Sequence, residues 1–255
     1  MNQKGGTGKT TVATNIAACL AEENMRVLLI DMDPQAHATE CIADPLDPNQ
    51  IEPSIRDLLI GNEDIRNTIH VARFSRNLHY IPSTIDLLIE EYRLGSFAGI
   101  DPEKFKIKID PIRDDYDYIL CDCPPNLGFF TRSALRAADH VVVPMEPEPL
   151  AYRGLETFMG VILPDVVMYN PNLRVNGVII VNRAPGHRKY LPEEIKRRIV
   201  SGWGQGFLFR TEIPLDVKVA ESPKYHIPVS IRIRSSTAAQ AFRLLTQEFI
   251  QRIPP

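Results

Sequence analysis

The sequence has no long hydrophobic run. Uninterrupted apolar stretches such as residues 27–30 and 178–181 are the length of buried strands. A helix that spans a bilayer needs roughly 18 or more apolar residues, so we expect a soluble protein. The N-terminal residues lead directly into a glycine-rich segment without an apolar secretory region, which favours a cytoplasmic location.

Cysteine and histidine are scarce. The four cysteines are expected to be free thiols in a reducing compartment, and the six histidines are scattered without zinc-ligand spacing. Cys121 and Cys123 flank Asp122 in an apparent strand, which directs both thiols to one face and the carboxylate to the other. The sequence therefore offers no zinc site.

The formal charge of −3 is unevenly distributed along the chain. From residue 183 to the C-terminus there are 13 Lys and Arg against 6 Asp and Glu, whereas the preceding part has 16 against 26. A basic last third suggests a polyanionic partner, but a solvated surface explains the charge equally well.

Composition and pattern predict the fold class. With 255 residues, of which 44% are hydrophobic, the chain can bury one large core, and we expect a single domain over residues 1–255. Short apolar runs alternate with amphipathic stretches, which is typical of an α/β fold: a mostly parallel twisted sheet with helices on both faces. Strands are predicted at residues 26–31, 78–81, 116–122, 140–144, 174–181 and 207–213. Helices are predicted at residues 9–23, 131–138, 155–168, 192–200 and 236–253.

A glycine-rich segment opens the first predicted helix. Its backbone N–H groups can close around phosphate oxygens at the positive end of the helix, which makes it a P-loop for ATP. Lys9 is placed to reach the β- and γ-phosphates, and the Thr10 hydroxyl to bind Mg²⁺. The loop residues are Lys4, Gly5, Gly6, Thr7, Gly8, Lys9, Thr10 and Thr11.

The strand that normally precedes a phosphate loop is missing from the sequence. Only three residues come before Lys4, whereas such a loop ordinarily connects a central strand to a helix. Either the recorded start lies downstream of the true one, or the sheet lacks a central strand and exposes two edges. We favour the first alternative.

Two further strands end in carboxylates suited to nucleotide chemistry. Asp33 follows the first apolar run, where it can orient the attacking water, sense the γ-phosphate and contribute to Mg²⁺ binding. Asp31 is interpreted as a structural residue at the strand end. Asp122 ends a later strand, the arrangement that holds Mg²⁺ through its water shell.

These motifs resemble a known family. The pattern Lys-Gly-Gly-x-Gly-Lys-Thr is similar to the deviant Walker A loop of ParA/MinD ATPases, and residues 2–6 resemble the ParA/Soj branch. Residues 31–35 are similar to its Asp-x-Asp-Pro-Gln first switch, and the strand ending at Asp122 to its second. The resemblance implies that Lys4 reaches the γ-phosphate bound to the other subunit of a nucleotide-sandwich homodimer.

The resemblance extends nearly to the C-terminus. Residues 142–155 are similar to the next strand and helix of the family, and residues 211–223 to its late Ile-Pro-x-Asn/Asp-Val-Arg/Lys segment. Leu215 stands where arginine is frequent, which puts one basic contact in doubt. By position, the residues expected to border the adenine are Asn182, Arg183, Pro214 and Asp216.

The implied function is that of a ParA-like partition ATPase. ATP would close a dimer that binds DNA without sequence preference, a ParB-like partner would stimulate slow hydrolysis, and the protein would segregate a plasmid, chromosome or other cargo. The ATP-bound form would then be nucleoid-associated. Clustered Lys and Arg release counterions from DNA, which gives the basic last third a physical role. The DNA-binding candidates are Arg210, Lys218, Arg232 and Arg234.

Two other classes of protein contain related phosphate loops. A MinD-like protein would use the same switch on membranes and needs an amphipathic tail. Residues 236–253 instead have the spacing of a core-packing helix, followed only by two prolines, so no membrane partner is expected. Metabolic ligases and reductases with related loops need a substrate pocket or cluster-ligating cysteines, and the sequence indicates neither.

Overall fold

The computed structural model describes residues 8–44, 51–93, 101–181 and 190–255. The strands are β1 (Val27–Asp31), β2 (His70–Val71), β3 (Leu78–Ile81), β4 (Tyr118–Asp122), β5 (His140–Met145) and β6 (Arg174–Ile180). The helices before β5 are α1 (Lys9–Glu22), α2 (His37–Ile42), α3 (Ile55–Leu59), η2 (Ile65–Thr68), α4 (Asp86–Arg93), α5 (Glu103–Ile109), η3 (Asp110–Asp115) and α6 (Phe129–Ala137). Those after β5 are α7 (Pro149–Thr157), η4 (Phe158–Ile162), α8 (Leu163–Tyr169), α9 (Tyr190–Trp203), η5 (Gln205–Phe207), α10 (Val217–Glu221), η6 (Ser222–Tyr225), α11 (Val229–Arg232) and α12 (Thr237–Arg252).

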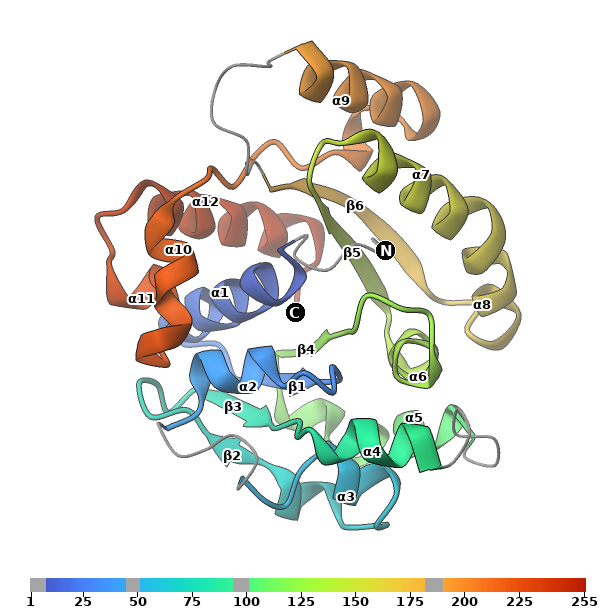
Figure 1. The fold of residues 1–255 in the computed structure, drawn as a ribbon, viewed down its shortest axis with the longest axis vertical. Coiled ribbons are helices and arrows are strands. Elements are labelled where there is room, and N and C mark those ends of the chain that lie inside the picture. Colours follow the sequence, from blue (N-terminus) through green and yellow to red (C-terminus); the bar gives the residue numbers. More distant parts are fainter. Residues whose placement is uncertain (1–7, 45–50, 94–100, 182–189) are drawn as a thin grey trace.

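The sheet consists of two separate parts within the described ranges. One has the strand order β2-β3-β1-β4, and the other pairs β5 with β6. Every pairing is parallel except that of the short strand β2 with β3. Figure 1 shows the two parts facing each other across the molecule, with β4 and β5 on the facing sides. The predicted α/β class with a mostly parallel sheet is confirmed.

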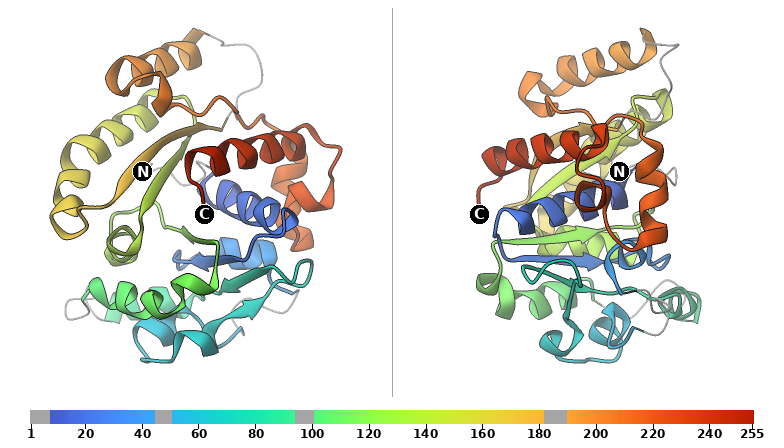
Figure 2. Two further views of the ribbon diagram at one scale, coloured as in Figure 1. Left: turned by 180° about the vertical axis from the view of Figure 1, so that it is seen from behind. Right: turned by 90° about the vertical axis from the view of Figure 1, so that its left-hand side faces the viewer.

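Helices cover both faces of the larger sheet because β1 is apolar on both sides. Its residues 27–30 are fully buried, and alternate side chains enter two different cores. Val27 and Leu29 pack in the core that includes Phe242 of α12 and residues of α1. Leu28 and Ile30 pack in the opposite core with residues of α3, α5 and α6. Figure 2 shows α1 and α12 on one side of the strands and α3 and α5 on the other.

The predicted strand at residues 207–213 is wrong. Among the described residues, this segment pairs with β6 only in two isolated bridges, Val178 to Leu208 and Val181 to Ile213. Between them, the N–H groups of Arg210 and Thr211 donate to the Glu248 carboxylate of α12 at 2.9 and 3.0 Å. A side chain therefore takes the donors that a continuous strand ladder would use.

The predicted helix at residues 155–168 begins earlier and is not uniform. It starts at Pro149, passes through a π-helical turn at η4, and continues as α8. Pro164 lies in the first turn of α8, where its ring would clash with the carbonyl four residues earlier in a regular α-helix, and a π-helical turn at this point relieves that crowding. In the described part of the chain, no helix is long and apolar enough to cross a membrane.

Candidate nucleotide site

The carboxyl ends of β1 and β4 bring three acidic residues together next to the start of α1. The two strands pair in parallel with Asp31 opposite Asp122, and the N–H of Met32 donates to the Asp122 carbonyl at 2.8 Å. Asp33 follows directly and is buried. In open parallel sheets, ligands bind at this edge, outside the carboxyl ends of the strands.

The N-terminus of α1 is built to accept an anion. Gly8 precedes the helix with φ +82°, and a Cβ placed on it would lie 3.1 Å from Val181 Cγ1, so this position requires glycine. In the described part of the chain, the helix has no side-chain N-cap and no acidic residue in its first turn, which leaves its first N–H groups and positive end available to an anion. The predicted loop residues Lys4 to Thr7 lie outside the described residues.

Lys9 lies among the acidic groups. Burial lowers the pKa of Lys9, while the charges of Asp122 and Asp33 and the nearby Cys123 act in the opposite direction. Both carboxylates are therefore electrostatic neighbours of the lysine. The structure thus brings together Lys9, Asp33 and Asp122, which are separated by up to 113 positions in the sequence.

Asp31 and Asp122 differ sharply in how their oxygens are satisfied. Asp31 accepts hydrogen bonds from the Thr39 N–H and hydroxyl, both at 2.8 Å, and from the Asp33 N–H at 3.1 Å. This supports its interpretation as a structural residue. Asp122 is also buried and accepts a hydrogen bond from Thr10, but its Oδ2 has no hydrogen-bond partner among the described residues.

Asp122 is a buried carboxylate with an unsatisfied oxygen, and it lies next to a second carboxylate, so a bound cation would stabilise it. Burial raises the pKa of Asp122 to about 8, and the charges of Asp31 and Asp33 add to the effect. Mg²⁺ prefers oxygen ligands, retains several waters and is commonly held by one or two carboxylates together with nucleotide phosphates. The predicted metal-binding residues Thr10, Asp33 and Asp122 fit such an ion.

Replacement of Asp122 should raise the stability of the nucleotide-free protein while it weakens the binding of Mg-ATP. We expect Asp122→Asn to stabilise the nucleotide-free protein by about 1–3 kcal/mol at neutral pH, because burial beside Asp31 disfavours the ionised carboxylate that the unfolded chain carries, and an amide has no such cost. For a chain of this size that corresponds to a rise in Tm of roughly 3–10 °C. The same change should weaken Mg-ATP binding about tenfold or more, measured by calorimetry.

The matched control is Asp31→Asn, which makes the same chemical change one strand away. It should lower Tm, because the Asp31 carboxylate accepts three hydrogen bonds that an amide cannot all keep. Equal destabilisation by both substitutions would show that Asp122 is an ordinary structural carboxylate.

The residues predicted to border the adenine are only partly described. Asn182 and Arg183 lie outside the described residues. Pro214 is half-buried and follows Ile213, whose bridge to Val181 brings this segment close to Gly8. The adenine contacts stay a prediction.

Asp216 forms hydrogen bonds that stabilise the starts of two helices. It caps α10 by accepting from the Lys218 N–H at 3.0 Å, and it also accepts from the Thr237 hydroxyl at 3.2 Å and the Ala238 N–H at 3.4 Å. Burial works against ionisation, but these hydrogen bonds outweigh it and keep the pKa of Asp216 below its usual value. Asp216 therefore ties the start of α10 to the start of α12.

The four DNA-binding candidates differ in how exposed their side chains are and in whether other residues of the chain engage them. Arg210 and Lys218 are exposed. Arg232 is half-buried and lies over the Tyr225 ring, 3.4 Å from its centroid. Arg234 is 70% exposed but forms an ion pair with Glu22 of α1. Arg210 and Lys218 are thus the exposed members of this group that form no direct ion pair among the described residues, and the role of all four in DNA binding stays a prediction.

Two residues of the site region were missed by sequence reasoning. Thr39 holds Asp31, and its hydroxyl also accepts from the Ser83 N–H at 2.9 Å. Glu248 directs the segment that contains Arg210. Neither residue belongs to a local motif, because its partners are distant in sequence.

A glycine that begins a helix, a lysine in the first turn and two strand-end aspartates define a P-loop nucleotide-binding protein. Residues 1–175 match the family described as AAA domain. The sporulation initiation inhibitor protein Soj of Bacillus subtilis is 32% identical over 97% of this chain and 95% of its own length. The chromosome-partitioning ATPase Soj of Thermus thermophilus is 34% identical, over 99% of this chain and 94% of its own.

A solved structure supports the same fold. Cobyrinic acid a,c-diamide synthase from Mycobacterium smegmatis, with bound ADP and magnesium, superposes with a TM-score of 0.78 at 28% identity, covering 98% of this chain and 92% of that one. The chain belongs to the ParA/Soj family of partition-type P-loop ATPases, and the predicted family resemblance is confirmed.

Proposed function

We propose that this protein is an ATP-switched dimeric ATPase that binds DNA without sequence preference and moves or positions a DNA cargo together with a ParB-like partner. The observation that carries the proposal is the meeting of Lys9, Asp33 and Asp122 at the N-terminus of α1. ATP and Mg²⁺ are the cofactors that fit this arrangement. The Soj relatives, whose names refer to chromosome partitioning, support the biological role.

The chain's own groups divide the work at the nucleotide. The N–H groups at the start of α1 and the Lys9 ammonium bind and orient the phosphates. Asp33 is buried close to Lys9, where its carboxylate can position the attacking water and accept its proton. Bound Mg²⁺, held by Thr10 and Asp122, would neutralise the phosphate charge.

Dimerisation by ATP would complete the site. Lys4 is the residue assigned to the partner's γ-phosphate, on the resemblance of its loop to the deviant Walker A motif. A cation supplied in this way stabilises the charge that develops on the phosphoryl oxygens, and is worth on the order of 10³–10⁵ in rate.

DNA binding would follow from the dimer. A single subunit presents Arg210 and Lys218 as exposed candidate contacts, and with so few phosphate contacts its affinity for DNA should lie near the weak end of about 10⁻⁴–10⁻⁶ M. Pairing two such faces makes the second contact intramolecular, which can raise the apparent affinity by roughly 10²–10⁴. ATP would then control both events.

The test is the affinity for duplex DNA as a function of salt, with ATP and with ADP. We expect tight, salt-sensitive binding only with ATP, and Lys218→Glu should weaken binding to unrelated sequences about equally and reduce the salt dependence. The matched control is Lys106→Glu on α5, which makes the same charge change on an element distant from α10 (Figure 1).

Binding that is equally tight in both nucleotides, or equally impaired by the two substitutions, would defeat the proposal. A parallel arm with anionic vesicles distinguishes the membrane alternative: ATP-dependent sedimentation with vesicles and none with DNA would assign the switch to a lipid surface instead.

A further inference from the structure

A basic pocket lies at the edge of the larger sheet opposite to the candidate nucleotide site. Its volume is about 400 Å³, and it forms where the amino ends of β3, β1 and β4 come together. These strands are neighbours in parallel register, with Val27 opposite both Leu78 and Tyr118, so the residues that precede them meet along one line. The pocket lining includes Arg26, Arg66, Arg76, His79 and Tyr116.

The three arginines differ in how far the chain already engages them. Arg26 donates to both carboxylate oxygens of Asp117, at 3.0 and 3.5 Å, and these hydrogen bonds lower the pKa of Asp117. Arg66 pairs with Asp115 at 3.3 Å, and both side chains are 57% exposed. Arg76 is exposed and forms no ion pair among the described residues. Because exposed ion pairs contribute little net free energy, an anion can replace Asp115 on Arg66 at small cost, and Arg76 is available to it.

One wall of the pocket consists of two rings that fix each other's position. The Tyr116 hydroxyl lies 2.8 Å from Nδ1 of His79, and the rings pack edge to face with their centroids 5.5 Å apart. Burial raises the pKa of Tyr116, so its hydroxyl keeps the proton that it donates. With Tyr116 as the donor, Nε2 of His79 carries the ring proton and can donate to an anion. Ile69 adds an apolar surface, which limits water around the charged groups and strengthens ionic contacts.

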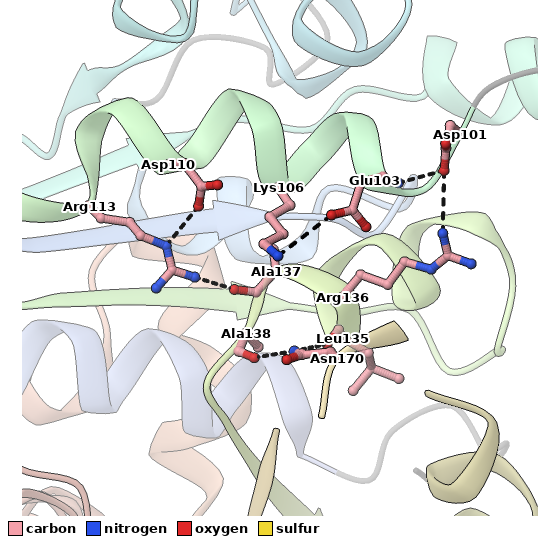
Figure 3. A network of polar contacts seen from close by, with 10 residues as sticks. All are labelled: Asp101, Glu103, Lys106, Asp110, Arg113, Leu135, Arg136, Ala137, Ala138 and Asn170. Atoms are coloured by element: carbon pink, nitrogen blue, oxygen red, sulfur yellow. Dashed lines mark hydrogen bonds and ion pairs between the residues drawn. The ribbon is translucent and has the colours of Figure 1, made fainter. Parts of the chain in front are cut away.

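The segment that leads into this wall is held from its far side. Helix η3 carries Asp115 and ends just before Tyr116. Figure 3 shows Arg113 of η3 in contact with Asp110 and with the Ala137 carbonyl at the end of α6. These contacts fix the position of η3 relative to α6, so the pocket is largely preformed and binding needs little ordering of the chain.

We propose that this pocket binds a small oligophosphate, a ligand with two or more linked phosphate groups. Guanidinium groups are planar donors that match phosphate oxygens in pairs, and such charge-assisted bonds are the strong class of hydrogen bond. Arg66 and Arg76 supply them, and Arg26 extends the basic wall. The volume lies within the range of small-molecule sites, and a single phosphate group would leave most of it empty. The site is separate from the candidate nucleotide site and independent of the proposed ATPase function.

The experiment is a calorimetric titration with inorganic pyrophosphate, carried out on Lys9→Ala protein without Mg²⁺ so that the candidate nucleotide site contributes little. We expect saturable binding with a Kd of roughly 10⁻⁵–10⁻⁴ M. Arg66→Ala and Arg76→Ala, each in this background, should weaken it by about tenfold or more, because a hydrogen bond to a charged group contributes a factor of this order. Both side chains are exposed, so neither substitution should change Tm by more than about 2 °C.

Two further variants make the test specific to the pocket. Arg198→Ala on α9 is the matched control for Arg66→Ala, since its guanidinium is also 57% exposed and pairs with one carboxylate, that of Glu194. It should leave pyrophosphate binding unchanged. Asp115→Asn removes the competing carboxylate from Arg66 and should strengthen binding by about threefold or more.

The absence of saturable pyrophosphate binding, or equal weakening by Arg66→Ala and Arg198→Ala, would overturn the proposal. So would an Asp115→Asn variant that binds no more tightly than its background. A parallel titration with duplex DNA, on protein that retains Lys9, tests the other source of phosphate. Loss of DNA binding in Arg66→Ala and Arg76→Ala, with no binding of pyrophosphate, would assign these arginines to the DNA backbone instead.

Discussion

Lys9→Ala is expected to lower the affinity for Mg-ATP by about 10²–10³-fold, the largest effect on nucleotide affinity expected of any single substitution in this protein. Lys9 is the side-chain cation in the first turn of α1, and charge-assisted bonds to phosphate are the strong class of hydrogen bond. Removal of one such contact costs roughly 3–4 kcal/mol, which corresponds to that loss. Isothermal calorimetry with ATP and Mg²⁺ measures it directly.

The same substitution should leave the nucleotide-free fold intact. Burial lowers the pKa of Lys9, so the charged ammonium is not a net source of stability in the free protein. We expect the Tm of the free variant to lie within about 2 °C of the parent. Ligand at 100 times the parent Kd stabilises the parent by about 2.7 kcal/mol, and this increment should almost vanish in the variant.

The control for Lys9→Ala is Lys106→Ala on α5, whose ammonium pairs with Glu103 at 3.6 Å on the surface. It removes the same charge and should leave ATP affinity unchanged. Calorimetry that shows parental affinity for Lys9→Ala would remove this lysine from the phosphate site, whatever the family resemblance.

Asp33→Ala is expected to reduce the rate of ATP hydrolysis by about 10²–10⁴-fold while ATP affinity changes by no more than a few fold. The expectation rests on the proposed role of the Asp33 carboxylate as the group that orients water, since positioned general bases contribute rates of this order. Single-turnover hydrolysis and calorimetry separate the two quantities. Because hydrolysis would end the dimeric state, the variant should also remain dimeric with ATP, measured by light scattering.

Asp33 also has a local structural contact, so a stability control is needed. Its Oδ1 accepts from the Gln35 N–H at 3.0 Å, and loss of this bond should cost about 1 kcal/mol. Asp114→Ala, at an exposed position in η3, removes a carboxylate without touching the site and should hydrolyse ATP normally. Normal hydrolysis by Asp33→Ala, or loss of ATP binding as severe as in Lys9→Ala, would contradict the assigned role.

The local pattern of the sequence predicted most of the sheet. β1, β3, β4, β5 and β6 fall where continuous apolar runs were found, with boundaries within two residues of those predicted. Such runs are informative because a strand buried on both faces must be apolar throughout. The short elements β2 and α2 to α5 were not predicted, since they contain too few residues to express a period.

The sequence predicted which residues belong to the candidate site, but not how their side chains are arranged around one another. The order of the motifs selected Lys9, Thr10, Asp33 and Asp122 from the sequence, because each motif is a local arrangement of loop and strand end. Local motifs could not predict that Asp31 accepts three hydrogen bonds whereas Oδ2 of Asp122 has no partner among the described residues. This difference depends on Thr39 and on the parallel register that sets the two carboxylates side by side.

By itself, then, the sequence determined the α/β class, and it predicted the phosphate loop and the two switch carboxylates, because those features depend on residues that are neighbours along the chain. Tertiary structure alone decided which of the basic candidates are engaged by other residues, since Glu22 pairs with Arg234 and the Tyr225 ring stacks against Arg232. It also decided that residues 207–213 do not form a strand, because Glu248 takes their donors.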